Sequence, residues 1–210
     1  MILPKVCAKT NKPKLSYSQT SSWEVYKDNY IKQYFAGIKL PQSPYAEFGN
    51  KVGVARETGD YSNFSKQEQE ILNSIERVAN TQYEYEILLD MGEFVVQGFI
   101  DELVPTKDGY IIIDNKTGGK DKMDEYRSID YLQTVIYRMA LEQQGLNVVD
   151  TQVRFFGREG SHIKPPMVLS GYLELIPIEY NQQRVDYAIA KLHRVASEIS
   201  LMYKAYKELL

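Results

Sequence analysis

Two apolar segments joined by a polar turn constrain the fold of this chain more than any other feature. The first covers residues 94–104 and the second residues 110–116. Between them, Pro105 fixes its own backbone φ at a turn value, and Gly109 can take a left-handed conformation. The pattern predicts a β-hairpin whose second strand is buried.

The hairpin brings three ionisable side chains together. On a strand, residues i and i+2 point to the same face, so Asp114 and Lys116 project together while Asn115 points away. Pairing of the two strands would bring Asp101 alongside them. Two carboxylates on one face suit a divalent cation, and a neighbouring lysine suits an attack of water on a phosphodiester. The sequence therefore predicts a metal-dependent hydrolytic site here.

Periodic patterns on either side of the hairpin predict the rest of the fold. Helices are expected at residues 17–34, 45–56, 65–78, 128–144 and 181–210, and further strands at residues 83–89, 148–156 and 168–178. Ser65 and Glu68 have the spacing of a capping box. We therefore expect an α/β (α+β) fold with a central mixed sheet of about five strands and helices on both faces.

A chain of 210 residues favours one domain over residues 1–210. We divide it into a mainly helical N-terminal part (residues 1–80), a sheet core with the motif-bearing helix (81–178) and a C-terminal helix (181–210).

Charge and the scarcity of cysteine and histidine limit the kinds of site available. The net charge is −3, so a nucleic-acid-binding face would have to be a local basic patch. The single Cys7 excludes an intramolecular disulfide and a cysteine-ligated metal cluster, and His162 and His193 are too few for a histidine-rich metal site. With neither a secretion signal nor a membrane-spanning run, we expect a cytoplasmic location and no membrane partner.

Three motifs follow one another along the chain. They are Gly98-Phe99-Ile100-Asp101, Ile111-Ile112-Ile113-Asp114-Asn115-Lys116-Thr117-Gly118 and Gln133-Thr134-Val135-Ile136-Tyr137. In this order they resemble the PD-(D/E)XK nuclease superfamily, and in particular its RecB-like branch, which includes lambda-type and CRISPR-associated exonucleases. The resemblance covers roughly residues 45–140 and implies a restriction-endonuclease-like core, without the iron–sulfur cysteines of some members.

The resemblance implies a role for each motif residue. Asp101 and Asp114 would bind Mg²⁺ or Mn²⁺, with the main-chain carbonyl of Asn115 as a further ligand. Lys116 would orient the attacking water or stabilise charge that develops on the phosphate. Other residues are expected to support the site or bind substrate: Gln133, Tyr137, Thr117, Lys120 and Arg127.

One departure from the family pattern concerns the third metal ligand. Many RecB-like nucleases carry a metal-binding histidine in a Gly-x-x-hydrophobic-His pattern on an upstream helix, but the matching run here ends in Gly53. Glu57 lies one turn later on the same helical face, and we predict that its carboxylate replaces the imidazole. The alternative is a carboxylate from the strand before the hairpin, with Glu86 preferred to Glu84.

These features predict a metal-dependent DNA nuclease, most simply an exonuclease in DNA recombination, repair or end processing. The alternative is a catalytically silent DNA-binding or assembly module on a nuclease scaffold, which the missing histidine and the acidic pI of 5.6 favour. DNA is the expected partner. A recombination or replication protein, an oligomer, and a phage or bacterial source are compatible with either hypothesis.

Overall fold

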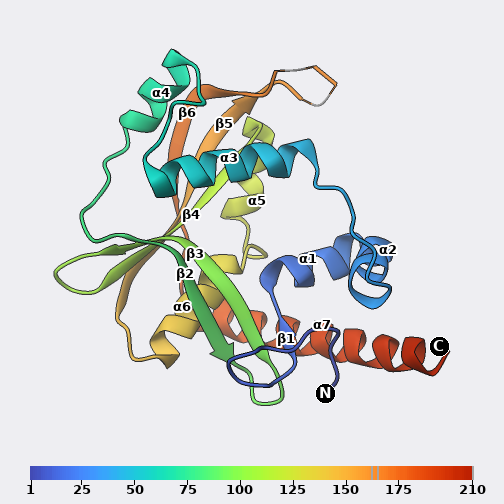
Figure 1. Ribbon diagram of the computed structural model, residues 1–210. Helices are drawn as coiled ribbons and strands as arrows, with labels where there is room; N and C mark the ends of the chain where they lie inside the picture. The colour runs from blue at the N-terminus through green and yellow to red at the C-terminus, as the bar shows by residue number, and fades with distance from the viewer. Residues whose placement is uncertain (162, 165, 210) are drawn as a thin grey trace.

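A mixed sheet of six strands forms the centre of the computed structural model, which describes residues 1–161, 163–164 and 166–209 (Figure 1). The strands are β1 (Lys14–Leu15), β2 (Gln82–Asp90), β3 (Val95–Pro105), β4 (Tyr110–Gly118), β5 (Val148–Glu159) and β6 (Val168–Pro177). The predicted hairpin is β3–β4, which pair antiparallel, while β4 and β5 pair parallel. The α/β (α+β) class with a mixed sheet is confirmed. The sixth strand is the two-residue β1, which is too short to give a periodic signal.

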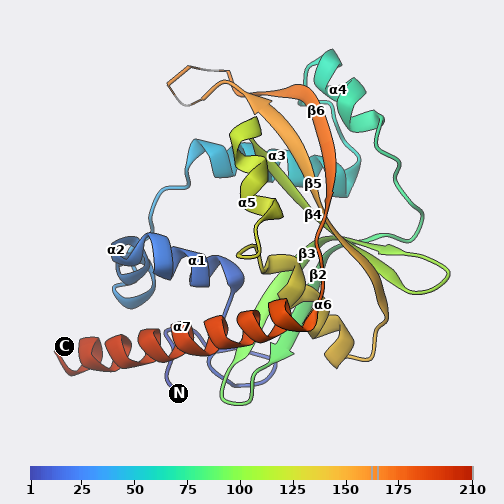
Figure 2. The same cartoon turned by 180° about the vertical axis from the view of Figure 1, so that it is seen from behind.

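Helices cover both faces of this sheet (Figures 1 and 2). They are α1 (Tyr17–Val25), α2 (Lys27–Tyr30), a π-helical turn (Ile31–Phe35), α3 (Pro44–Thr58), α4 (Lys66–Asn73), a 3₁₀ turn (Lys120–Lys122), α5 (Met123–Arg127), α6 (Gln133–Gln143) and α7 (Gln182–Glu208). Phe155 of β5 packs in the core with α6 and α7, and Phe156 packs in a second cluster with α3 and α4. The side chains of these two adjacent strand residues thus pack on opposite faces of the sheet. Among the described residues, no helix has the length and apolarity needed to cross a membrane.

Several predicted helix limits need correction. The helix expected at residues 17–34 is interrupted because Tyr26 leaves helical geometry, with φ −132° and ψ 52°. The helix at 65–78 has the predicted Ser65–Glu68 capping box but ends at Asn73. The last helix ends at Glu208, and Leu210, like His162, lies outside the described residues.

The helix expected at residues 128–144 begins only at Gln133. The cause is the buried Arg184 of α7, whose Nη2 donates to the main-chain carbonyls of Ser128 at 2.9 Å and Tyr131 at 2.7 Å. These bonds hold Ser128, whose backbone is extended at ψ 148°, and the residues after it in a link between α5 and α6 that brings the Tyr131 hydroxyl to Asp114.

One edge of β3 is shared by two strands that leave a gap between them. β2 occupies the other edge over almost the whole length of β3. β1 pairs only with Val95 and Val96, and β4 pairs only with Glu102 to Pro105. Among the described strands, residues 97–101 therefore have no partner on this edge. The gap places the first sequence motif beside an opening in the sheet.

Candidate active site

The two motif carboxylates lie where the β3–β4 pairing ends. The last residue pair of this ladder is Glu102 with Ile113, and the next residue on each strand is Asp101 or Asp114. The strands no longer pair beyond this point, but the main-chain N–H of Asn115 donates to Asp101 Oδ2 at 2.6 Å. The fold thus brings both carboxylates to the mouth of the gap, as the sequence predicted.

Asp114 is completely buried, with 0% of its surface exposed. Its Oδ2 accepts a hydrogen bond from the Tyr131 hydroxyl at 2.7 Å and lies 2.7 Å from Lys116 Nζ. Its Oδ1 has no partner within the described chain. A buried anionic oxygen without a partner is costly, and a bound cation would supply the missing interaction.

The electrostatic environment favours the charged form of Lys116 and disfavours the charged form of Asp101. Burial and the negative charge of Asp114 raise the pKa of Asp101 to about 7. Burial opposes the charge of Lys116, but the carboxylates of Asp114 and Asp101 outweigh it and raise the pKa of the ammonium. Lys116 therefore remains a cation, and ionisation of Asp101 is disfavoured in the absence of further positive charge.

The third motif reaches the site through a hydrogen-bonded chain. Gln133 Nε2 donates to the Tyr137 hydroxyl at 2.8 Å, and the Tyr131 hydroxyl lies 3.4 Å from Gln133 Oε1. Gly98 allows this helix to approach β3, because a Cβ at that position would lie 2.6 Å from Tyr137 Cε1. Gln133 and Tyr137 are thus brought close to Asp114. The contact between Gly98 and Tyr137 explains why the first motif has a glycine, since a larger residue would clash with the ring.

Oxygen donors at the gap fit a hard divalent cation. In an extended strand, the N–H and C=O of one residue point to the same edge, so the Asn115 carbonyl is directed toward β3 together with the N–H that binds Asp101. Asp101, Asp114 and this carbonyl form an oxygen set of the kind that Mg²⁺ and Mn²⁺ prefer, with water completing the coordination. The described residues contain no group of three or more Asp, Glu, His or Cys side chains placed to hold an ion without rearrangement.

Comparison with known proteins agrees with this geometry. A family model described as the PD-(D/E)XK nuclease superfamily matches residues 28–204. The chain belongs to the PD-(D/E)XK nuclease superfamily. A search of curated proteins found no match.

Solved structures share the restriction-endonuclease-like fold of the superfamily. A candidate exonuclease from Eubacterium rectale has a TM-score of 0.58 at 12% identity, over 98% of this chain and 88% of that one. A phage-related exonuclease from Haemophilus somnus 129PT has a TM-score of 0.51 at 13% identity, over 92% of this chain and 82% of that one. At these identities the likeness concerns the fold.

The position of the missing superfamily histidine opens onto a groove of about 490 Å³. Gly53 of α3 lines this groove with Glu57, Glu84 and Asp101, and a Cβ at Gly53 would meet nothing within 4 Å. Thr117 also lines it. Glu57 therefore lines the same groove as Asp101, and its role as a metal ligand stays a prediction.

The strand carboxylate that the sequence preferred, Glu86, does not line the groove that contains Asp101. Glu86 binds Lys9 and, at 2.7 Å, Gln97, away from the groove. Glu84 falls opposite Asp101 in the β2–β3 register and has a positive φ of 49°, which is uncommon for a residue other than glycine. Burial, and then the charges of Glu57 and Asp114, raise the pKa of Glu84. Alternation along a strand could not reveal this backbone distortion.

Lys120 and Arg127 are not brought to the groove. Lys120 Nζ lies 4.7 Å from the centre of the Tyr172 ring, and Arg127 forms ion pairs with Asp124 at 3.3 Å and Glu174 at 2.5 Å. Both side chains serve the packing of α5 and the preceding turn on β6, so neither lines the described cavities around Lys116.

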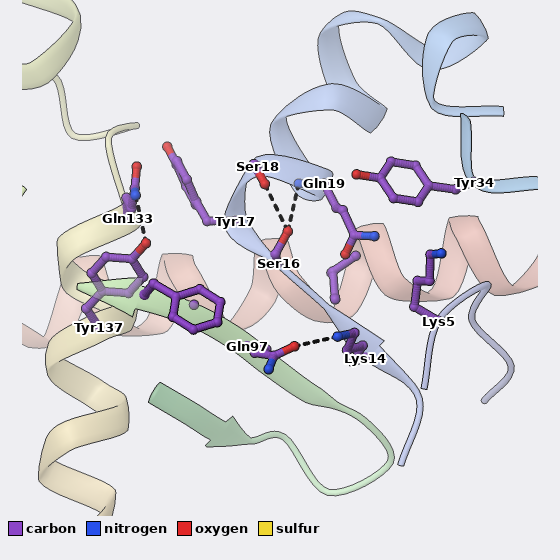
Figure 3. Close-up of a pocket in the computed structure, with 13 residues that line it drawn as sticks. Lys5, Lys14, Ser16, Tyr17, Ser18, Gln19, Tyr34, Gln97, Gln133 and Tyr137 are labelled. Atoms are coloured by element: carbon purple, nitrogen blue, oxygen red, sulfur yellow. Dashed lines mark hydrogen bonds between the residues drawn. The ribbon is translucent and has the colours of Figure 1, made fainter. Parts of the chain in front are cut away.

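A second cavity of about 490 Å³ adjoins the site and was not predicted (Figure 3). Its walls come from the N-terminal arm, the start of α1, β3 and α6, and include Lys5, Lys14, Phe99 and Gln133. No carboxylate lines it, and we call it the basic pocket. A third cavity of about 670 Å³, which includes Lys116, contains four carboxylates and only one further lysine. The lysines of the irregular N-terminal arm, which include Lys5 and Lys14, were the sequence feature that could have indicated the basic pocket.

Proposed function

We propose that this protein is a Mg²⁺- or Mn²⁺-dependent deoxyribonuclease that acts as an exonuclease. The observation that carries the proposal is the buried, unpartnered Oδ1 of Asp114 beside a second carboxylate and a protonated lysine. A bound cation would give this oxygen the partner that the chain does not provide. Two structures of the same fold are described as exonucleases, which supports action at a strand end.

Asp101, Asp114 and the carbonyl of Asn115 would hold the metal, which when bound supplies Lewis acidity and a reactive water. Lys116 is protonated, so its role is electrostatic: it stabilises negative charge on the phosphate or orients the water. Gln133 fixes the Tyr137 hydroxyl and supports this arrangement.

The distribution of charge around Lys116 supports one approach for the nucleic acid. The ammonium groups of Lys5 and Lys14 in the basic pocket attract phosphates, whereas the third cavity is lined by four carboxylates, three of which are in ion pairs, and offers no excess of positive charge. Phe99, which is 47% exposed, offers a ring on which a base can stack. The strand would therefore enter from the side of the basic pocket.

The wider biological setting belongs to the same proposal. A single-domain enzyme of DNA recombination, repair or end processing, in the cytoplasm of a phage-infected or free-living bacterium, fits these properties. A recombination or replication protein as partner and an oligomeric state are compatible with this proposal.

A catalytically silent DNA-binding module is the second candidate, because Gly53 stands where a metal-binding histidine occurs in the RecB-like pattern. The experiment that separates the two uses end-labelled linear DNA and closed circular DNA, single- and double-stranded, with Mn²⁺ and with EDTA. A Lys116→Ala variant is the matched control. Metal-dependent loss of linear DNA alone, absent in the variant, supports an exonuclease, and nicking of the circle indicates an endonuclease. DNA binding without any cleavage supports the silent module.

A further inference from the structure

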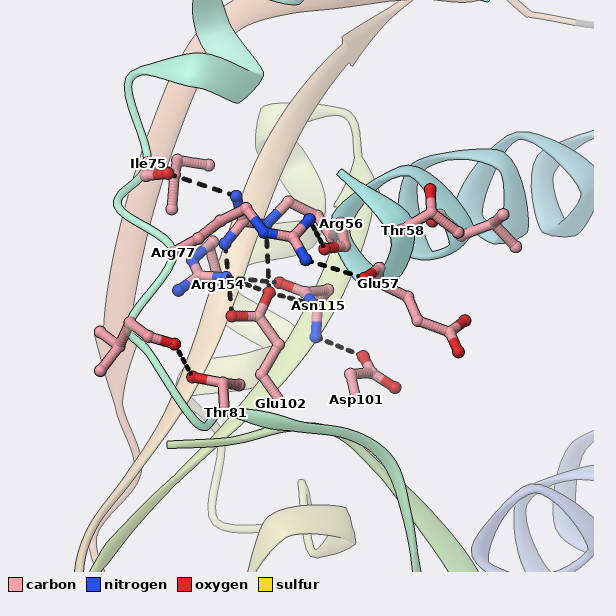
Figure 4. A network of polar contacts seen from close by, with 12 residues as sticks. Arg56, Glu57, Thr58, Ile75, Arg77, Thr81, Asp101, Glu102, Asn115 and Arg154 are labelled. Carbon is pink, nitrogen blue, oxygen red and sulfur yellow. Dashed lines mark hydrogen bonds and ion pairs between the residues drawn. The ribbon is translucent and has the colours of Figure 1, made fainter. Parts of the chain in front are cut away.

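A buried network of charged residues lies directly behind the candidate active site (Figure 4). Glu102 of β3 is its centre and is 2% exposed, while Arg56 of α3 and Arg154 of β5 are 0% and 6% exposed. Arg56 binds Glu102 through Nε at 3.1 Å and Nη2 at 3.3 Å, and Arg154 Nη1 binds Glu102 Oε1 at 2.5 Å. Burial opposes the charge of Glu102, but Arg154 and Arg56 lower the pKa of its carboxyl group. The network is therefore fully ionised.

Each member of this network is the direct neighbour of a site residue. Glu102 follows Asp101, and Arg56 precedes Glu57. Arg154 is the partner of Asn115 in the β4–β5 ladder. Because consecutive strand residues point to opposite faces, the network holds the same strands from the face opposite the reactive groups.

Both polar atoms of the Asn115 side chain form hydrogen bonds with the network. Its Nδ2 donates to Glu102 Oε1 at 3.1 Å, and its Oδ1 accepts from Arg154 Nη1 at 3.2 Å. This residue lies between Asp114 and Lys116, and its main-chain N–H holds Asp101. Hydrogen bonds at both ends of the side chain therefore restrain the main chain at Asn115, and with it the peptide groups that connect Asp114 and Lys116.

The far end of the network is anchored to the main chain. Arg56 Nη1 donates to the carbonyl of Ile75 at 3.3 Å and to the Tyr61 hydroxyl at 3.3 Å. Arg77 donates to the carbonyls of Arg56 at 2.7 Å and Glu57 at 2.9 Å, which fixes the end of α3 (Figure 4). These bonds hold the end of α3, which carries Glu57, to the segment between α4 and β2.

We propose that Arg154 and Glu102 are positioning residues that set the orientation of the Asn115 peptide and thereby the affinity of the site for its divalent cation. The inference rests on the proposed function, since it assigns the control of that same site. Residues that orient metal ligands from outside the coordination sphere commonly change metal affinity by about 10- to 100-fold when replaced.

The test compares Mn²⁺ binding by full-length variants in the absence of DNA, measured by calorimetry and by electron paramagnetic resonance of free Mn²⁺. Arg154→Met keeps most of the side-chain volume but releases Asn115 Oδ1, and we expect Mn²⁺ affinity to fall about tenfold. Arg154→Lys keeps one positively charged donor but loses the planar guanidinium that contacts both Glu102 and Asn115, so we expect an intermediate Mn²⁺ affinity. If the methionine variant does not fold, the lysine variant carries the test.

Leu192→Ala is the matched control, because Leu192 of α7 is 1% exposed and lies in the core away from the network. We expect it to lower the melting temperature without changing Mn²⁺ affinity. In cleavage assays, Arg154→Met should lower kcat and leave KM for DNA unchanged, because Arg154 does not line the grooves.

Unchanged Mn²⁺ affinity in both Arg154 variants would overturn the positioning role and leave the proposed function intact. An equal loss of affinity in Leu192→Ala would also overturn it, since destabilisation alone would then explain the effect. If the unmodified protein binds no Mn²⁺, the proposed function fails and this inference fails with it.

Discussion

Two clusters of buried charge lie on opposite faces of β3 and β4, and they differ in how completely their charges are satisfied. Behind the strands, Glu102 receives hydrogen bonds from two arginines and Asn115. In front, Asp114 keeps an unpartnered oxygen and Asp101 has a raised pKa. The charges of the rear cluster are satisfied within the described chain, whereas the proposed cation would complete the front cluster. The difference shows how a single hairpin can be rigid and reactive at once.

Neutralising the centre of the rear cluster should have the largest effect on stability. Glu102→Gln leaves Arg56 and Arg154 without the carboxylate that they share. We expect the free energy of unfolding to fall by about 3–5 kcal/mol in urea titrations. Glu125→Gln, which breaks only the exposed ion pair with Lys122, should change it by less than about 1 kcal/mol. Similar losses in both variants would contradict the assigned difference between network and surface pair.

Removing the cation of the front cluster should affect the reaction and leave binding largely intact. For Lys116→Ala we expect kcat for DNA cleavage to fall by about 10²–10³-fold, because the lysine stabilises charge in the transition state. DNA affinity, measured by fluorescence anisotropy, should remain within a few-fold. Equal losses of affinity and cleavage would place Lys116 in substrate binding instead.

The raised pKa of Asp101 makes the metal-free protein pH-sensitive. The folded state holds the Asp101 proton more tightly than the unfolded state, so this group lowers stability as the pH rises from about 4 to its folded pKa of about 7. Asp101→Asn cannot ionise. We therefore expect it to melt at a higher temperature than the unmodified protein at about pH 8, with little difference at about pH 4.

Added Mn²⁺ should reverse this order at the higher pH, because it stabilises only the protein that binds it. A melting difference that is the same at both pH values would show that ionisation of Asp101 does not destabilise the fold.

The three glutamates proposed as further ligands can be ranked by Mn²⁺ affinity. We expect Glu57→Ala and Glu84→Ala to weaken binding several-fold, because both side chains line the groove with Asp101. Glu86→Ala should have no effect, because Glu86 binds Lys9 and Gln97. A larger effect of Glu86→Ala would move the third ligand from Glu57 to the strand alternative that the sequence also offered.

The smallest effect is expected at Gly53. Gly53→Ala replaces a glycine inside α3 with a better helix former, and its Cβ meets nothing within 4 Å. The free energy of unfolding should rise by about 0.5–1 kcal/mol. Gly59→Ala is the contrasting control, because Gly59 has φ +74° and a Cβ there would lie 2.6 Å from Arg77 Nη1. A loss of stability in Gly53→Ala would mean that the groove wall needs a glycine.

The sequence predicted the hairpin and the front cluster because both depend on short-range rules. Alternation places Asp114 and Lys116 on one face, and the turn at Gly109 sets the hairpin that brings Asp101 near. The i and i+4 spacing placed Gln133 beside Tyr137. Mg²⁺ or Mn²⁺ binding remains a prediction.

The rear cluster could not be found by the same rules, because its members are far apart in the sequence. Glu102 and Arg154 are 52 residues apart, and Arg56 is 46 residues from Glu102. A signal was present nevertheless. Glu102 and Arg154 are charged residues with apolar residues close to them on their strands. A charged side chain at such a position is rarely buried without a partner. The backbone distortion at Glu84 and the helix interruption by Arg184 left no comparable signal.

The gap between β1 and β4 also affects the motions of the sheet. Amide protons of residues 97–101 that face it are not held by a neighbouring strand among those described, so they should exchange with solvent faster than the amides paired with β2. Among the described residues, main chain without a partner strand on one edge therefore lies beside Asp114, the most buried carboxylate. A substrate strand lying along this edge would slow that exchange, and the amides would report its arrival before any bond is broken.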